Sequence, residues 1–162
     1  MSRLSDRNLV FRVPFEALDD SLEFLRRQGR RGHEGVALWA GKFSDAEFRI
    51  VRAIIPRQMT GRLFYRISDD ETFRILESVS NEELVIPMQI HSHPKEAFHS
   101  EVDDERAFIR HENAISIVVP HFADFPVAEF LLHARFYRLR EATTWEEMQP
   151  AEIGSVLQFE GV

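Results

Sequence analysis

Residues 89–104 read Gln-Ile-His-Ser-His-Pro-Lys-Glu-Ala-Phe-His-Ser-Glu-Val-Asp-Asp, and this segment decides how the chain is interpreted. The residues before it are strand-like and lead directly into His91 and His93. Side chains two positions apart on a strand point to the same face, so both imidazoles can face one ion. Pro94 ends the strand and holds His93 extended. Because neutral imidazoles suit zinc, the segment predicts the first two ligands of a zinc site.

A third ligand is expected from the start of the next helix. Ser100 and Asp103 have the spacing of a helix cap, which predicts a helix over residues 100–110 with Asp103 in its first turn. Two histidines and one carboxylate leave the fourth tetrahedral position open for water, as in catalytic zinc sites. Asp104 is the alternative third ligand, and His99 is expected to be a cleft or surface residue.

The rest of the chain predicts interleaved strands and helices. Gly29 is expected to end the first helix in the left-handed conformation, and residues 41–45 are expected to form a hairpin turn. Pro87 predicts an edge strand or a bulge. The expected strands are 9–13, 36–40, 48–55, 84–90, 115–119, 128–133 and 136–139; the expected helices are 14–28, 68–79 (with Phe73, Ile75, Leu76 and Val79 on its apolar side) and 100–110. Without a regular alternation of strands and helices, the fold class is α/β with a mixed sheet.

Composition excludes several classes of protein. With 162 residues, 44% apolar and 29% charged, the chain predicts one globular domain over residues 1–162. A net charge of −7 favours neither nucleic acid nor anionic lipid as a partner. The absence of cysteine removes thiol nucleophiles and thiolate ligands. Residues 1–8 lack the apolar stretch of a signal peptide, and no apolar run approaches membrane-spanning length, so a cytoplasmic protein is expected.

Two further groups of residues are interpreted as structural or are left without a role. The arginines at the end of the first predicted helix are interpreted as a solvated helix end rather than an anion-binding patch. Several histidines have no other candidate residues around them and are assigned no role. The arginines are Arg26, Arg27, Arg30 and Arg31, and the histidines are His33, His111, His121 and His133.

The motifs together resemble a known family. Glu34, the segment His91-Ser92-His93-Pro94 and the segment Ser100-Glu101-Val102-Asp103 resemble the JAMM signature of the JAB/MPN metalloprotease superfamily. The stretch from Glu34 to Gly41 also resembles the first motif of that family, in which a glutamate opens a buried strand that ends in glycine. The matching motifs span residues 34–119, and their sequences are most similar to those of small bacterial JAB proteins.

The resemblance implies a fold and a set of roles. The fold would be the JAB/MPN, cytidine-deaminase-like fold, with a mixed, mainly antiparallel sheet flanked by helices. His91, His93 and Asp103 would bind Zn²⁺, Glu34 would be the general base that deprotonates the attacking water, and Ser100 would help to stabilise the oxyanion.

The same resemblance implies a substrate and competing functions. Known members cleave peptide or isopeptide bonds, often after the C-terminus of a ubiquitin-like protein, so the expected partners are such a protein or its conjugate and E1-like and E2-like enzymes. One alternative is a non-catalytic MPN-like binding scaffold. The other is a zinc peptidase or amidase that acts on a small substrate.

Overall fold

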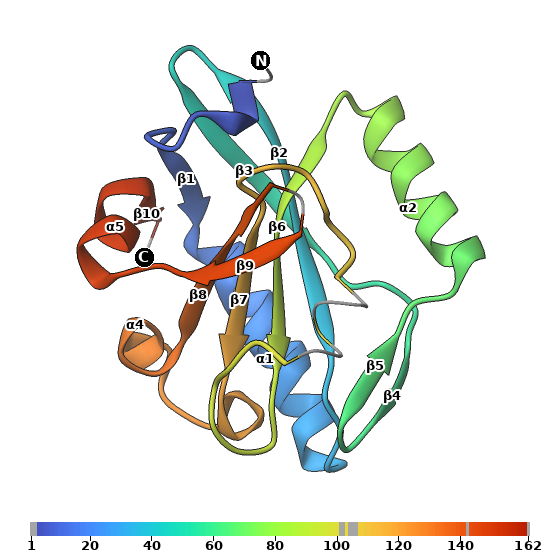
Figure 1. Ribbon diagram of the computed structural model, residues 1–162. Helices are drawn as coiled ribbons and strands as arrows, with labels where there is room; N and C mark the ends of the chain where they lie inside the picture. The colour runs from blue at the N-terminus through green and yellow to red at the C-terminus, as the bar shows by residue number, and fades with distance from the viewer. Residues whose placement is uncertain (1–2, 101–102, 104–106, 142, 162) are drawn as a thin grey trace.

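The computed structural model describes residues 3–100, 103, 107–141 and 143–161 (Figure 1). Within these ranges the chain forms one large sheet, a small separate hairpin and helices on both faces of the large sheet. The strands are β1 (Phe11–Pro14), β2 (Val36–Ser44), β3 (Glu47–Ile54), β4 (Met59–Gly61), β5 (Phe64–Arg66), β6 (Val85–Ser92), β7 (Ile115–Val119), β8 (Arg135–Arg140), β9 (Thr144–Glu147) and β10 (Leu157–Glu160). The helices are α1 (Phe15–Arg30), α2 (Asp69–Asn81), α4 (Phe130–His133) and α5 (Pro150–Val156), with 3₁₀ turns at Arg3–Ser5, His121–Ala123 and Val127–Glu129.

The large sheet is mixed and mainly antiparallel, as expected. Its strand order is β10-β1-β3-β2-β6-β7-β8-β9. The pairs β2–β3, β2–β6, β7–β8 and β8–β9 are antiparallel, whereas β1–β10, β1–β3 and β6–β7 are parallel. The strand that carries the histidines, β6, therefore lies in the middle of the sheet with a neighbour on each side.

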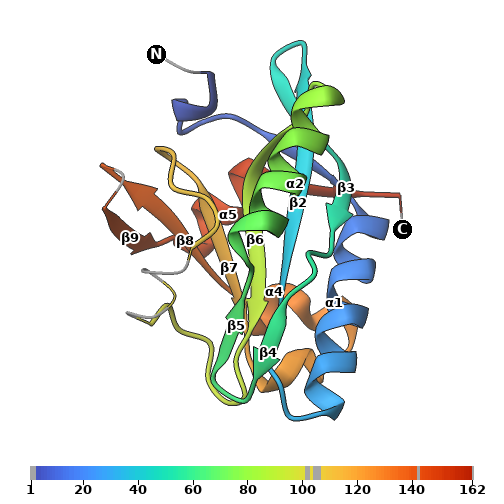
Figure 2. The same ribbon diagram turned by 90° about the vertical axis from the view of Figure 1, so that its right-hand side faces the viewer.

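Helices cover the two faces of this sheet (Figures 1 and 2). Ala37 and Trp39 of β2 belong to the core under α1, and Val36 and Leu38 belong to a second core with residues of α2. Successive strand residues point to opposite faces, so a strand covered on both sides is a continuous apolar run. The expected buried strand at residues 36–40 is confirmed.

Helix α1 begins after Pro14 as expected but ends later. It runs to Arg30, and the glycine with positive φ beyond its end is Gly32 (φ 70°), not Gly29. Gly29 lies within the helix, where a Cβ atom would stand 2.3 Å from the Cβ of Phe122. Glycine is required there because another segment packs against the helix backbone.

The β2–β3 hairpin also differs from the prediction. Its turn is at Asp45 (φ 56°) and Ala46, so β2 continues through Gly41. The β2–β3 register shifts at Gly41, and a Cβ atom there would stand 2.0 Å from the carbonyl oxygen of Arg49. Gly41 marks a β-bulge with a close approach of two backbones, not the end of a strand.

Pro87 lies at a bulge in a central strand, so the edge alternative is wrong. Trp39 pairs with Met88 and Gly41 pairs with Val85, which leaves Ala40 opposite two residues of β6. Pairing of β6 with β7 begins only at Met88. The missing N–H of proline therefore interrupts neither ladder.

Two predicted elements in the C-terminal half are wrong. Residues 128–133 form the end of a 3₁₀ turn and helix α4 rather than a strand, and Leu131 and Leu132 are both exposed. The helix predicted over residues 100–110 does not extend that far, because residues 107–110 are not helical; Asp103 is helical, and residues 101–102 and 104–106 lie outside the described residues. Strand 136–139 is confirmed as β8, whereas β9, α5 and β10 were not anticipated.

Helix α2 begins as predicted, but the side that it buries differs from the expected one. Ser68 caps it by accepting a hydrogen bond from the N–H of Glu71 at 3.2 Å. Ile75 and Val79 are buried, whereas Phe73 and Leu76, which were expected on the same apolar side, are exposed. Among the described residues, no helix is long and apolar enough to cross a membrane.

Candidate metal centre

Strand β6 presents the two histidines from the centre of the sheet. The ring centroids of His91 and His93 are 5.3 Å apart, and both side chains are buried. His91 is paired on one side with Val36 and on the other with Val118. The N–H of His93 donates to the carbonyl of Val119 at 2.9 Å, so the ladder with β7 continues past the end of the strand. Both imidazoles therefore project from a backbone held by two neighbours.

Asp103 reaches the same point from the segment that follows. Its Oδ2 lies 3.3 Å from Nε2 of His91 and 3.1 Å from Nε2 of His93. The same oxygen accepts the N–H of Ser100 at 2.8 Å, and the N–H of Asp103 donates to Oγ of Ser100 at 3.2 Å. This reciprocal cap fixes the carboxylate beside the histidines. The alternative ligand, Asp104, lies outside the described residues.

The three side chains fit a divalent metal ion. One ligand atom from each lies within 4.8 Å of the others. Metal–ligand bonds of ~2.0–2.2 Å in a tetrahedral zinc site put ligand atoms about 3.3 Å apart, close to the separations observed. Neither ring nitrogen of His91 has a hydrogen-bond partner among the described residues, although both are buried. A buried polar atom without a partner is costly, and coordination of a metal ion by Nε2 would remove that cost for this atom.

The charge state of Asp103 also suits a metal ligand. Burial by itself raises the pKa of this carboxyl group. The neighbouring His91 ring, the contact with His93 and the N–H of Ser100 oppose burial, and together they lower the pKa below its usual range. The side chain is therefore an anion at neutral pH, which metal coordination requires.

Glu34 is brought to the same place by the register of the sheet. Val36 pairs with His91, and the N–H of Ser92 donates to the carbonyl of Gly35 at 3.1 Å, so the antiparallel register continues to place Glu34 opposite His93. The N–H of Glu34 donates to the carbonyl of Gly61 in the β4–β5 hairpin at 2.8 Å. The side chain is 5% exposed and lines one pocket with His93 and Asp103.

The environment of Glu34 changes its acidity. Burial raises the pKa of its carboxyl group to about 7, with His93 opposing and the negative charge of Asp103 adding to the rise. A carboxyl group with a pKa near the working pH can both accept and release a proton. Perturbed carboxyl groups of this kind are concentrated at functional sites.

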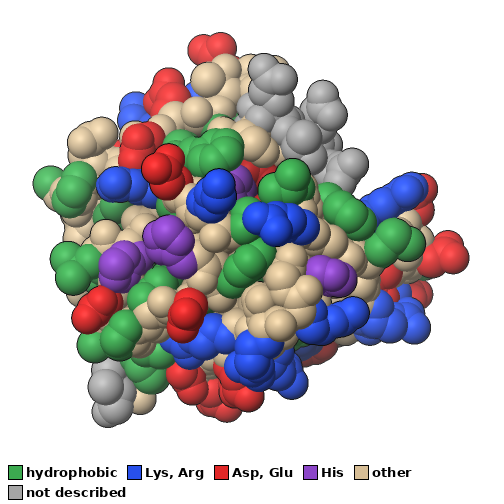
Figure 3. Space-filling view, turned by 90° about the horizontal axis from the view of Figure 1, so that it is seen from below, with side chains coloured by type: hydrophobic (Ala, Val, Ile, Leu, Met, Phe, Trp, Pro, Cys, Tyr) green, Lys and Arg blue, Asp and Glu red, His purple; other side chains and the backbone are tan. Residues whose placement is uncertain are grey.

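The pocket around these groups has a volume of about 470 Å³. Phe98, which lies edge-on to His93 at 4.7 Å, and Leu63 are exposed at its mouth. The full lining is Glu34, Arg62, Leu63, His93, Pro94, Lys95, Glu96, Phe98, Ser100 and Asp103. Figure 3 views the molecule from the end where β6 leaves the sheet, and there basic, acidic and apolar side chains are mixed rather than separated into fields of one charge.

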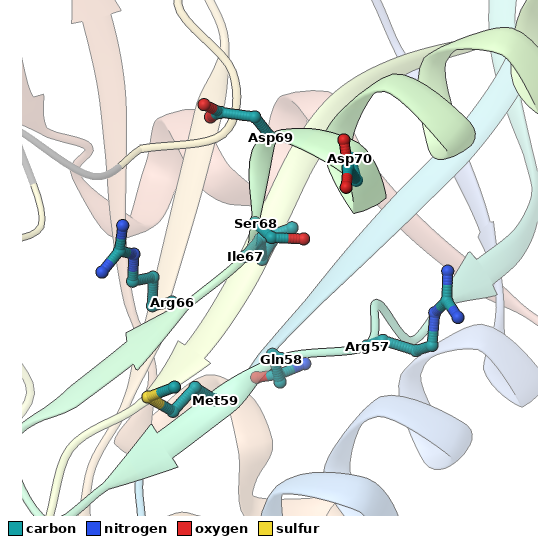
Figure 4. A pocket seen from close by; sticks show the side chains of 8 residues that line it. All are labelled: Arg57, Gln58, Met59, Arg66, Ile67, Ser68, Asp69 and Asp70. Carbon is teal, nitrogen blue, oxygen red and sulfur yellow. The ribbon is translucent and has the colours of Figure 1, made fainter.

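A larger hollow of about 650 Å³ lies elsewhere, between the β4–β5 hairpin and the start of α2 (Figure 4). Arg57 and Arg66 stand on opposite sides of it, with Asp69 and Asp70 at the beginning of the helix. Its lining contains none of the three candidate ligands. Size alone does not indicate a site, so the smaller pocket with convergent ligands is the candidate.

Two residues near the centre were missed in the sequence. Gln89 is fully buried; its Oε1 accepts the N–H of Phe108 at 2.9 Å and its Nε2 donates to Oγ of Ser116 at 3.2 Å. A polar residue two positions before His91 on the same strand face was the signal. The ring of Tyr65 lies 5.6 Å from that of His91, and nothing local in the sequence indicated this contact from a separate hairpin.

His99 lies beside the centre but outside the candidate ligand group. Its ring is 5.9 Å from that of His91 and 4.8 Å from that of Trp145. The group of potential ligands among the described residues consists of His91, His93 and Asp103. His99 is half-buried and is not among the residues that line the pocket, so its expected place in a cleft or on the surface stays a prediction.

Comparisons with known proteins identify the family. The model described as prokaryotic homologs of the JAB domain matches residues 19–138. The chain belongs to this family. This prokaryotic JAB protein is 34% identical over 157 residues, 94% of the chain and 95% of the relative, to the probable metalloprotease y4jG of Sinorhizobium fredii (strain NBRC 101917 / NGR234).

A solved structure shares the fold of this JAB protein. The solution structure of protein DSY2949 from Desulfitobacterium hafniense matches with a TM-score of 0.64 and 13% identity, covering 93% of each chain. At that identity the likeness concerns the fold alone. The expected JAB-type mixed sheet flanked by helices is confirmed, and the residues matched to the family include the five predicted site residues.

Proposed function

We propose that this protein is a cytoplasmic zinc metallopeptidase that cleaves the amide bond following the C-terminus of a ubiquitin-like protein, in a conjugate or a precursor. The observation that carries the proposal is a buried carboxyl group, Glu34, that lines one pocket with His93 and Asp103 of the buried His91-His93-Asp103 group. The family and the name of the y4jG relative support the metallopeptidase part. The ubiquitin-like substrate rests on the resemblance of the motifs.

The residues divide the chemistry among them. His91, His93 and Asp103 would hold the ion, and a bound Zn²⁺ supplies Lewis acidity, which lowers the pKa of water and polarises a carbonyl group. Glu34, with a pKa raised to about 7, accepts the proton of the attacking water and passes it to the leaving amine. For an isopeptide, this amine is a lysine side chain.

Ser100 contributes at the carbonyl group of the substrate. Its Oγ accepts the N–H of Asp103, which leaves the hydroxyl hydrogen available to donate. Because Ser100 lines the pocket, that hydrogen can be directed at the oxyanion formed when water attacks. The capping role and the catalytic role use different atoms of one hydroxyl group.

The surroundings of the pocket suit an extended peptide. The apolar Leu63 and Phe98 and the basic Arg62 and Lys95 line it together. An extended C-terminal segment can gain backbone hydrogen bonds beside a strand while its side chains contact such a rim. E1-like and E2-like enzymes, which produce conjugates of this type, are the proposed functional partners.

The test is a cleavage assay with a panel of ubiquitin-like proteins fused at their C-termini to a reporter. We expect the zinc-loaded protein to cleave at least one fusion, a chelator to stop cleavage, and re-added zinc to restore it. Glu34→Gln should keep the metal and lose cleavage. If the protein binds zinc but hydrolyses only small amides, its substrate is not a ubiquitin-like protein. If it binds no zinc, a non-catalytic scaffold is favoured.

A further inference from the structure

The segment after β7 contains an unusual left-handed turn. His121, Phe122 and Ala123 have φ values of 53°, 52° and 61°, and none of them is glycine. Residues with a Cβ atom avoid this region, and a run of three is especially unfavourable. Such a conformation persists only where its surroundings over-determine it, and these cases are concentrated at functional sites.

Helix α1 supplies the groups that hold the turn. Nε of Arg26 donates to the carbonyl of Ala123 at 2.9 Å, and Nη2 of Arg26 donates to the carbonyl of Phe125 at 2.8 Å. Gly29, three residues further on the same helix face, lets Phe122 approach the helix backbone. Helix α1 therefore holds the turn in two ways: the guanidinium group of Arg26 binds its carbonyls, and Gly29 leaves room for Phe122.

The left-handed turn is also hydrogen-bonded to the backbone that carries His93 at the candidate metal centre. The N–H of Phe122 donates to the carbonyl of His93 at 2.8 Å, and the N–H of His121 donates to the carbonyl of Lys95 at 2.9 Å. With its own N–H bonded to Val119, His93 is hydrogen-bonded on both sides of its α-carbon. Both N–H groups belong to residues in the left-handed conformation, so the turn is joined to this loop through its backbone.

We propose that Arg26 is a positioning residue for the metal centre: it fixes the left-handed turn and through it the backbone, and hence the imidazole, of His93. This role rests on the proposed metal-binding function. It replaces the interpretation of Arg26 as part of a solvated helix end, because its guanidinium is bonded to two carbonyl groups 97 and 99 residues away. Arg27, one position along, is exposed and is the matched control.

The geometry explains why arginine is needed. The guanidinium group presents several N–H donors in a rigid plane and can bond two separate carbonyls at once. Lysine has a single ammonium group on a flexible stem, so Arg26→Lys should restore part of the effect lost in Arg26→Met. Partial rescue by the conservative variant is not expected if Arg26 serves only to cover apolar surface.

The experiment compares Arg26→Met with Arg27→Met. In the metal-free protein, amide hydrogen exchange of Phe122 and His121 should be about tenfold faster in Arg26→Met, with the amides of β1 unchanged. Zinc affinity, measured by chelator competition, should fall about 10–100-fold, and the visible spectrum of the Co²⁺-loaded protein should change. Arg27→Met should match the wild type in all three measurements.

A second variant, Gly29→Ala, tests the proposal even if Arg26→Met fails to fold. Gly29→Ala leaves Arg26 intact and introduces a Cβ atom against Phe122, so it should speed the same two amides and weaken zinc binding. Unchanged exchange and zinc affinity in Arg26→Met, or a uniform change at every amide, would overturn the proposal. If the wild type binds no zinc, the proposed function fails, and the exchange data alone still decide whether Arg26 holds the His93 backbone.

Discussion

Two buried glutamates, one on each side of the β4–β5 hairpin, have opposite environments. Glu71, at the start of α2, is 2% exposed; it accepts hydrogen bonds from Arg74 at 2.7 Å and from the side chain and backbone of Arg57 at 3.0 and 2.9 Å. These contacts, that with Arg74 above all, lower its pKa to about 2. Glu34 is 5% exposed and forms no salt bridge with any described residue, and burial raises its pKa to about 7.

The difference separates a structural carboxylate from one available for chemistry. Glu71 is ionised at neutral pH, and its charge joins the helix to the segment before β4. Glu34 has no cationic partner among the described residues, but it shares its pocket with two of the three candidate ligands, His93 and Asp103. A buried carboxyl group without a paired cation is unfavourable unless something else, such as a metal ion and its water, occupies the position of the cation.

The largest expected effect is on catalysis. Glu34→Gln should lower kcat about 10²–10⁴-fold, because the amide cannot accept a proton. Glu71→Gln should leave kcat within a few-fold of the wild type. Single-turnover cleavage of a ubiquitin-like fusion by the two zinc-loaded variants checks this, and equal losses in both would abolish the distinction.

For the free energy of unfolding, Glu71→Gln should have the larger effect of the two variants. Glu71→Gln should lower the free energy of unfolding by about 1–3 kcal/mol, because charge-assisted hydrogen bonds to Arg57 and Arg74 are lost. Glu34→Gln should leave the metal-free protein as stable as the wild type or more stable at pH 8. Urea denaturation of the metal-free proteins measures both, and a less stable Glu34→Gln variant would contradict the unpaired state of Glu34.

The pH dependence should differ in sign. The pKa of Glu34 is raised from 4.5 to about 7, so the folded state holds its proton longer and stability falls as pH rises through this range. The pKa of Glu71 is lowered from 4.5 to about 2, so its contribution is present above pH 4.5 and is lost toward pH 2. Urea unfolding of the metal-free proteins should show the first slope missing in Glu34→Gln and the second missing in Glu71→Gln.

The smallest expected effect is that of a substitution at Asp104, compared with its neighbour Asp103. Asp103→Asn should weaken zinc binding more than 100-fold, because Asp103 contacts both histidines, whereas Asp104→Asn should change it less than about twofold. Chelator competition with both variants distinguishes them. If zinc binding is lost in Asp104→Asn alone, the third ligand is Asp104 and not Asp103.

The sequence predicted the candidate centre better than its supports. The pair of histidines, the Ser-x-x-Asp cap and Glu34 have fixed spacings within local elements, and the structure brings all five residues into contact or into one pocket. Residues 128–133 were misjudged because a short apolar run suits a strand or a helix equally. The left-handed turn at Phe122 was not predictable, since no glycine announced it and Arg26 reaches it from a distant helix.

The position of a bound zinc ion tests the account most directly. Crystals grown with zinc and measured at the zinc absorption edge should show one ion bound by Nε2 of His91, Nε2 of His93 and a carboxylate oxygen of Asp103 at ~2.0–2.2 Å, with Glu34 beside its open side. An ion bound elsewhere, or no ion at saturating zinc, would contradict the account.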